Sequence, residues 1–94
     1  METIIELSKK TKKQLQKLPK SILSSFASWV LNVEMIGIEE TRKIPGYHDE
    51  LLKSPREGQR SVRLNRAYRV FYTVHENSIR IVHIIEINKH KYRV

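Results

Sequence analysis

Cysteine is missing from the 94-residue sequence, and glycine, proline and tryptophan are scarce, at three, three and one residues. Without cysteine, a disulfide scaffold, a cysteine-ligated zinc site and a thiol nucleophile are excluded. So few glycines and prolines exclude a collagen-like or low-complexity chain. No uninterrupted apolar run approaches about 18 residues, so we predict no membrane span. The opening Met-Glu-Thr-Ile-Ile-Glu lacks the basic and apolar regions of a secretory signal, and we expect a soluble, cytoplasmic protein.

What the sequence does contain is positive charge. Eighteen Lys and Arg oppose ten Asp and Glu, giving a net charge of +8, while 39% hydrophobic residues suffice for the core of one small domain, 1–94. Such a field attracts phosphate backbones, although the basic runs also suit a plain solvated surface. Basic side chains gather in 7–20 and 53–70, with further lysines near the C-terminus. The candidate RNA- or ribosome-binding residues are Lys9, Lys10, Lys12, Lys13, Lys17, Arg56, Arg60, Arg66, Lys89 and Lys91.

The first half of the chain has the pattern of one strand and two helices. The β-branched run 3–7 predicts a strand, and Ser8 is a suitable N-cap for a basic helix over 9–18. A second helix is expected from Ser21 to near Gly37, and the short linker predicts an antiparallel helix hairpin. Its apolar stripe consists of Ile22, Phe26, Trp29, Val30 and Val33, widened by Leu23, Ala27 and Leu31.

The second half predicts an antiparallel meander. After an irregular segment over 38–58, strands are expected at 60–64, 68–75 and 79–87. The fold class is therefore α+β: an antiparallel sheet, made of the three-stranded meander and the N-terminal strand, with an N-terminal helix hairpin packed on one face.

Alternation assigns the two faces of this sheet. A three-residue loop at 65–67 pairs Arg63 with Arg69, and a two-residue turn at 77–78 pairs Arg69 with Glu86. The face expected against the helices carries Val62, Leu64, Tyr68, Val70, Tyr72, Val74, Ile81, His83 and Ile85. We expect His83 to be a satisfied interior histidine.

The opposite face gathers groups that could act on RNA. It carries Arg63, Arg69 and Glu86 over a floor of Phe71 and Ile84, and an extended last strand would add Asn88, His90 and Tyr92. Acids, bases and cations suffice for attack by the ribose 2′-hydroxyl on its own phosphate, with candidates His90, Tyr92, Glu50 and Lys53 for proton transfer. An ordinary exposed sheet face with an Arg–Glu pair remains the alternative. The four histidines are too scattered to predict a metal site, and we expect no cofactor.

Four segments together resemble a known family. They are 46–53 (GYHDELLK), 60–64 (RSVRL), 68–72 (YRVFY) and 88–92 (NKHKY). With the order strand, helices, meander and short tail, they resemble the RelE/ParE toxin superfamily over essentially the whole chain. Within it, the chain looks most similar to the RelE, YoeB and HigB-type mRNA interferases.

This resemblance implies an endoribonuclease that cleaves mRNA in the ribosomal A site without metal. It also implies a cognate antitoxin, with operator DNA contacted only through the antitoxin complex. Arg69 resembles the arginine that stabilises the transition state, and Arg63 the basic residue of the preceding strand. The residues that resemble the remaining acid–base and stacking groups are Glu50, Lys53, His90 and Tyr92, with His48 matching a histidine of HigB-like members.

Two departures leave the reacting groups open. RelE itself has an arginine about where His90 stands, and Lys91 separates His90 from Tyr92, whereas some relatives place the matching residues side by side. Two other functions stay open: a ParE-like inhibitor of DNA gyrase, and a catalytically inactive nucleic-acid-binding relative.

Overall fold

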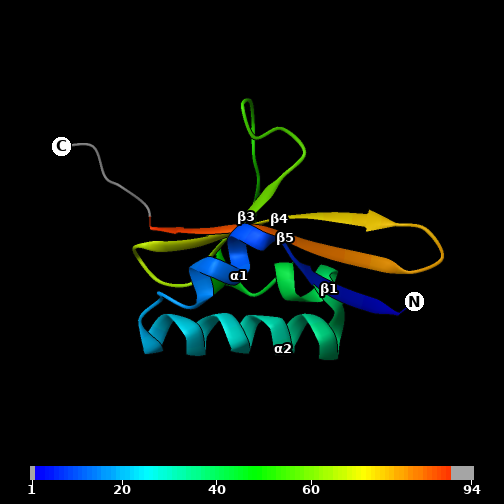
Figure 1. Cartoon of the computed structure of the whole chain (residues 1–94). Helices are drawn as coiled ribbons and strands as arrows, with labels where there is room; N and C mark the ends of the chain where they lie inside the picture. The colour runs from blue at the N-terminus through cyan, green and yellow to red at the C-terminus, as the bar shows by residue number, and fades with distance from the viewer. Residues whose placement is uncertain (1, 90–94) are drawn as a thin grey trace.

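The structure, a computed structural model, describes residues 2–89 of the chain. A five-stranded sheet lies over a long helix, and a loop rises from its other face (Figure 1). The elements, in chain order, are β1 (Thr3–Leu7), α1 (Lys9–Leu15), α2 (Lys20–Arg42), a 3-10 helix η1 (Pro45–Tyr47), β2 (Glu50–Leu51), β3 (Arg60–Arg63), β4 (Tyr68–Glu76) and β5 (Arg80–Lys89).

The sheet is mixed rather than antiparallel. Its order is β1-β5-β4-β3-β2, and β1 runs parallel to β5 while the other pairs are antiparallel. The meander of β3, β4 and β5 is confirmed, because short turns force consecutive strands to run antiparallel. The expected direction of β1 is wrong: two helices separate it from the meander, so no turn dictates how it pairs. Both helices follow β1 along the chain, so the pair is not itself at the N-terminus.

The first helix covers a strand edge rather than forming a hairpin on a sheet face. Ser8 caps α1, because its side chain accepts from the backbone of Thr11. Where β1 ends, the Ser8 amide donates to the Ile84 carbonyl at 3.0 Å and its hydroxyl donates to the Ile85 carbonyl at 2.6 Å. Further along, the Ile87 amide donates to Gln14 Oε1 at 2.7 Å. Helix α1 thereby supplies the hydrogen-bond partners that β1 no longer provides to β5.

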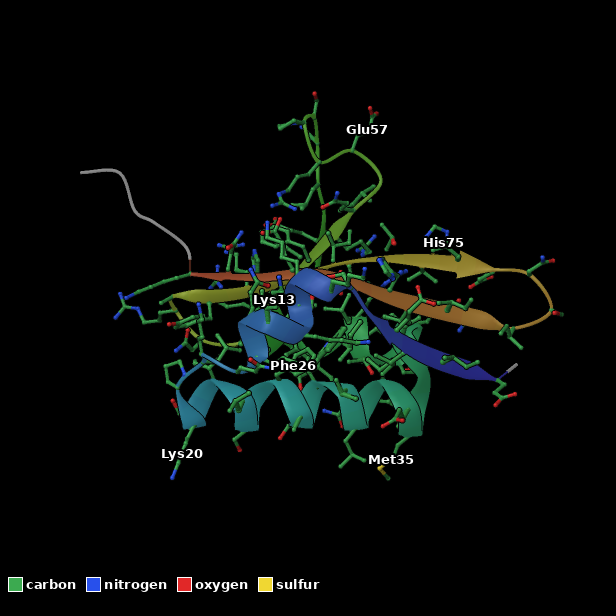
Figure 2. The ribbon with its side chains drawn as sticks, viewed as in Figure 1. Lys13, Lys20, Phe26, Met35, Glu57 and His75 are labelled. Atoms are coloured by element: carbon green, nitrogen blue, oxygen red, sulfur yellow. The ribbon has the colours of Figure 1, made fainter. Side chains whose placement is uncertain are left out.

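Helix α2 covers the lower face of the sheet, and Leu15 of α1 also packs against the core between them. Ile22, Phe26, Trp29 and Val33 are buried as predicted, and Phe26 points from α2 toward the sheet in Figure 2. Among the residues expected to widen this stripe, Ala27 and Leu31 are exposed.

The predicted end of α2 is a kink. Gly37 has φ 87° and ψ 161°, a conformation open almost only to glycine, and the helix resumes up to Arg42. Within the described residues, α2 is also the one helix long and apolar enough to cross a membrane, although polar residues interrupt its apolar sequence. Trp29 and Val33 are fully buried, as in the core helix of a globular protein.

The predicted register of the last hairpin is wrong. The Asn77 amide donates to the Ile79 carbonyl at 2.9 Å, and the turn uses three residues instead of two. This one-residue shift puts Val82 and Ile84 in the core and turns Ile81 and His83 to the other face. His83 is thus not an interior histidine: its Nδ1 lies 2.7 Å from Glu6 Oε1 on the neighbouring β1.

A bulge then restores the predicted faces. The register of β4 and β5 shifts between Phe71 and Tyr72, so that Ile87 is buried in the core and Glu86 pairs opposite Phe71. Glu86 therefore reaches the polar face as predicted, because the two one-residue shifts add up to two residues and so restore the alternation of faces. Arg69 pairs with Asn88 and not with Glu86, whereas the predicted pairing of Arg63 with Arg69 is confirmed.

Candidate active site

Four strands contribute one side chain each to a row across the upper face of the sheet. Glu50 of β2 pairs with Ser61 of β3, Ser61 with Phe71 of β4, and Phe71 with Glu86 of β5. Arg69 belongs to the next row of pairs, beside Arg63. The sheet therefore brings two carboxylates, a hydroxyl, an aromatic ring and guanidinium groups together on one rigid surface.

The loop between β2 and β3, residues 52–59, stands over this row as a wall. It rises from the sheet in Figure 1, and Figure 2 shows Glu57 near its outer end. The Leu52 amide donates to the Gln59 carbonyl at 2.9 Å and closes the loop at its base. Between loop and sheet lies an open cleft of about 510 Å³. It is lined by Glu50, Leu52, Lys53, Ser54, Pro55, Arg56, Ser61, Arg69 and Phe71.

Glu50 and Arg69 form the charged pair of this cleft. Arg69 Nη1 lies 3.4 Å from Glu50 Oε1, and His48 Nε2 lies 3.9 Å from Glu50 Oε2. Two neighbouring arginines repel each other unless an anion lies near them, and Glu50 supplies that charge next to Arg69. The Glu50 side chain is 47% exposed, so the pair is open to solvent and to a ligand.

Arg56 fastens the loop to the sheet. Its guanidinium carbon lies 3.9 Å from the centre of the Phe71 ring, and it donates to a Glu86 carboxylate oxygen. Lys10 of α1 also contacts Glu86, at 3.2 Å, so one carboxylate binds both the loop and α1. Burial acts to raise the pKa of Glu86, but hydrogen bonds from Arg56 and Lys10 outweigh it and hold the pKa below its usual value.

A second carboxylate is buried under the cleft. The Asp49 side chain is 1% exposed and accepts from Arg60 Nε at 2.6 Å and from the hydroxyl of Tyr72. The Tyr72 oxygen in turn accepts from Arg42 Nε at 3.4 Å. Burial, followed by the hydrogen bond to Asp49, raises the pKa of Tyr72. For Arg60, burial acts to lower the pKa, but the hydrogen bond to Asp49 prevails and raises it.

The structure brings some of the predicted site residues together and keeps others apart. Arg69, Glu50 and Lys53 meet in the cleft, and Arg63 lies beside Arg69 without lining it. Arg66 is exposed in the turn between β3 and β4. The predicted lysines of the described residues are all exposed. They lie on α1, just after it and at the end of β5: Lys9, Lys10, Lys12, Lys13, Lys17 and Lys89. His90, Lys91 and Tyr92 lie outside the described residues.

Asp49 and Ser61 are the site residues that the sequence did not reveal. Asp49 stands in an irregular stretch between η1 and the two-residue strand β2, too short for alternation to show its direction. Ser61 alternates correctly with Val62, but a serine in a strand carries no functional signal of its own. Its hydroxyl is buried and has no hydrogen-bond partner within the described residues.

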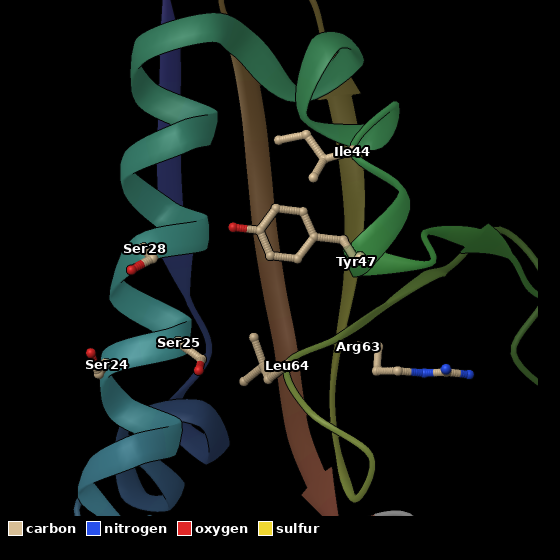
Figure 3. A pocket seen from close by; sticks show the side chains of 8 residues that line it. Ser24, Ser25, Ser28, Ile44, Tyr47, Arg63 and Leu64 are labelled. Atoms are coloured by element: carbon tan, nitrogen blue, oxygen red, sulfur yellow. The ribbon is translucent and has the colours of Figure 1, made fainter.

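A smaller cavity, of about 330 Å³, lies between α2 and η1. Figure 3 shows Tyr47 pointing its hydroxyl toward α2, whose Ser24, Ser25 and Ser28 border the cavity, while the side chain of Arg63 points away. The hydroxyl of Tyr47 accepts from Asn32 Nδ2 at 2.9 Å. The cleft under the loop 52–59, by contrast, is lined by the charged side chains of Glu50, Lys53, Arg56 and Arg69. Across residues 2–89, no cluster of three His, Cys, Asp or Glu is arranged to hold a metal ion.

Comparison with known proteins places the fold. No family model and no curated protein sequence matches the chain. Solved toxin structures do: the archaeal RelE–RelB complex from Pyrococcus horikoshii matches with a TM-score of 0.73 and 23% identity, over 95% of this chain and 96% of that one. The YoeB–YefM complex from Staphylococcus aureus matches with a TM-score of 0.71 and 21% sequence identity, over 97% of this chain and 100% of that one. YafQ from E. coli matches with a TM-score of 0.65 and 15% sequence identity, over 95% of this chain and 94% of that one.

These structures share one class of fold, that of the RelE/ParE toxins. The chain has this fold from β1 to β5, and the resemblance predicted from its sequence is confirmed at that level. Within the class, the likeness extends to YoeB, YafQ and RelE alike.

Proposed function

We propose that the protein is the toxin of a type II toxin–antitoxin system and an endoribonuclease that cleaves translated mRNA on the ribosome. The observation that supports this most is the Arg69–Glu50 pair on the floor of a cleft whose wall carries Lys53 and Arg56. Cations at this density suit a phosphate backbone, and a solvent-open carboxylate among them suits proton transfer. The fold shared with YoeB, YafQ and RelE supports the same function.

The reaction we propose uses a nucleophile from the substrate. Glu50 takes the proton of a ribose 2′-hydroxyl, whose oxygen attacks the adjacent phosphorus. Arg69, released from Glu50 as that carboxyl is protonated, stabilises the charge that builds on the phosphorane oxygens. The bond to the 5′ oxygen breaks, leaving a 2′,3′-cyclic phosphate and, once the leaving oxygen gains a proton, a 5′-hydroxyl. His90 and Tyr92 stay predicted as an acid–base and stacking pair, and in this proposal one of them supplies the proton to the leaving oxygen.

A cognate antitoxin is the partner we propose besides the ribosome and its mRNA. The related YoeB and RelE chains were solved as complexes named with YefM and RelB. On this chain, Leu31, Met35 and Ile36 are exposed on α2, at 55%, 73% and 48%, and Met35 points away from the sheet in Figure 2. An acidic amphipathic segment would complement both this apolar surface and the +8 charge, covering the helix or the cleft.

Mapping message ends after induction tests the nuclease. We expect Arg69→Ala to abolish both growth arrest and the cleavage stops seen by primer extension, since it removes the cation nearest Glu50. Arg80→Ala is the matched control: its side chain is 17% exposed against 20% for Arg69, but it pairs with Glu39 and Glu76 away from the cleft. Tyr92→Ala tests the tail in the same assay. Unchanged cleavage in both cleft and tail variants would reject the site.

Purified gyrase separates this function from the ParE-like one. We expect no inhibition of supercoiling by the wild-type chain. Inhibition of supercoiling without any cut in translated message would instead identify a gyrase inhibitor.

A further inference from the structure

Asp49 is the most deeply buried carboxylate beside the cleft, yet it does not line the cleft. Its side chain is 1% exposed and has two donors, Arg60 Nε at 2.6 Å and the hydroxyl of Tyr72. Tyr72 is fully buried and packs against Trp29, with ring centroids 5.4 Å apart. Asp49 is therefore fixed from two directions, by the strand β3 that carries Arg60 and by the core of the domain.

The next residue along the chain is Glu50, which faces the opposite way. Successive side chains of an extended backbone point to opposite sides, so an Asp49 held in the core side directs Glu50 into the cleft. Strand β2 consists of Glu50 and Leu51 alone, and so short a strand does little by itself to fix the orientation of the Glu50 side chain. The residue before Asp49 is His48, at φ 46°, so the chain turns sharply just ahead of this point.

A buried ion pair of this kind needs a reason other than stability. Taking Asp49 and Arg60 out of water costs about as much as their attraction returns, and an apolar pair of the same size would often stabilise the fold as well. What these contacts provide is a single orientation of the Asp49 carboxylate, because Arg60 and Tyr72 are both directional hydrogen-bond donors to it.

We propose that Asp49 is the positioning residue of the cleft: anchored by Arg60 and Tyr72, it holds the Glu50 carboxylate beside Arg69. The inference rests on the proposed nuclease function for its kinetic consequence, and its structural consequence stands independently. Arg60 then serves the site from beneath rather than as a ligand of RNA phosphate.

The kinetic test uses the full chain with programmed, translating ribosomes. We expect Asp49→Asn to lower kcat by about 10- to 100-fold with KM within about twofold, because a misplaced base impairs chemistry and not docking. Tyr72→Phe, which removes one donor and keeps the ring, should lower kcat by about threefold or more. Tyr47→Phe is the matched control, since it also removes a tyrosine hydroxyl bond, the one to Asn32, outside the cleft.

Two further comparisons test whether Asp49 acts on catalysis through Glu50. In a Glu50→Gln background, adding Asp49→Asn should cause no further loss of kcat, because the second change acts only through the first residue. In NMR spectra of the unliganded chain, Asp49→Asn should shift the Arg69 Nε–Hε resonance in the direction that Glu50→Gln shifts it.

The outcomes separate the two proposals. A wild-type chain that does not cleave message overturns the proposed function, and the Arg69 resonance still tests the positioning role. Folded Asp49→Asn and Tyr72→Phe variants with unchanged Arg69 resonance and unchanged kcat would overturn the role of Asp49. If Asp49→Asn does not fold, Tyr72→Phe alone decides by the same two measurements.

Discussion

At the scale of single residues, three carboxylates around the cleft differ in how far water reaches them. Asp49 is 1% exposed, Glu86 8% and Glu50 47%. The first two are each engaged by two or more donors, whereas Glu50 contacts Arg69 at 3.4 Å and is open to solvent. Of the three, Glu50 alone combines a cation partner with access for a substrate, which is why we assign it the proton transfer.

Glu86 gives a prediction about acid stability. Its pKa is below the ordinary value of about 4.5, so the stability it contributes is fully present above that pH and is lost as pH falls through the lowered pKa. We expect Glu86→Gln to cost about 1–3 kcal/mol of unfolding free energy at pH 7, and less below pH of about 4. Denaturant unfolding across pH measures both. Glu40→Gln, in an exposed pair with Lys43, is the control; a loss for Glu86→Gln that is equally large at low pH would contradict the account.

At the scale of elements, the kink of α2 depends on one backbone conformation. Gly37 stands at φ 87°, ψ 161°, and nothing lies within 4 Å of the position that a Cβ would occupy. The cost of a side chain there is therefore backbone strain and not a clash.

We expect Gly37→Ala to lower the free energy of unfolding by about 1–3 kcal/mol. Gly46→Ala, also with open space around its Cβ and without a positive φ, should change it little. Thermal or denaturant melts compare the two variants directly. Equal stabilities would show that the kink is not set by Gly37.

The same scale shows what the sequence could and could not predict. Ser8 as N-cap, the buried stripe of α2 and the meander were predicted, because capping, helical period and turn spacing are local signals. The direction of β1 was not, because a strand separated from its partner by two helices leaves no local trace. The register of β4 and β5 was misjudged because the turn and the bulge each add one residue, and neither carries a glycine to mark it.

The sequence predicted several of the residues that line the cleft but not the contacts that support them. Arg69, Glu50, Lys53 and the Phe71 floor follow from alternation and resemblance, and they do meet in one cleft. The supporting contacts were not foreseen: Arg56 and Arg60 are bound to Glu86 and Asp49, pairings that depend on how the loop 52–59 folds back onto the sheet.

At the scale of the whole molecule, the +8 charge predicts how binding responds to salt. Lys9, Lys12 and Lys13 are exposed on α1. Lys10 of the same helix contacts Glu86, the carboxylate that also binds Arg56 of the cleft, so this helix adjoins the site. Removing one lysine that binds a phosphate should make the plot of log affinity against log salt shallower by about one.

Co-sedimentation with ribosomes over a range of KCl concentrations tests this. We expect Lys12→Ala and Lys13→Ala each to weaken binding and flatten the slope. Lys43→Ala, at the end of α2, should do neither, since its ammonium already pairs with Glu40 at 3.0 Å. A slope that is the same for all three variants would assign the α1 lysines to solubility alone.

In the proposed reaction, an RNA 2′-hydroxyl, deprotonated beside Arg69 and Glu50, is the nucleophile. The direct measurement supplies the purified chain and programmed ribosomes with two messages that differ by a single 2′-deoxy nucleotide at the mapped cut. We predict that the ordinary message yields a 2′,3′-cyclic phosphate and a 5′-hydroxyl at that position, while the deoxy message stays whole there. Equal cleavage of both messages, or ends carrying a 5′-phosphate, would contradict the account.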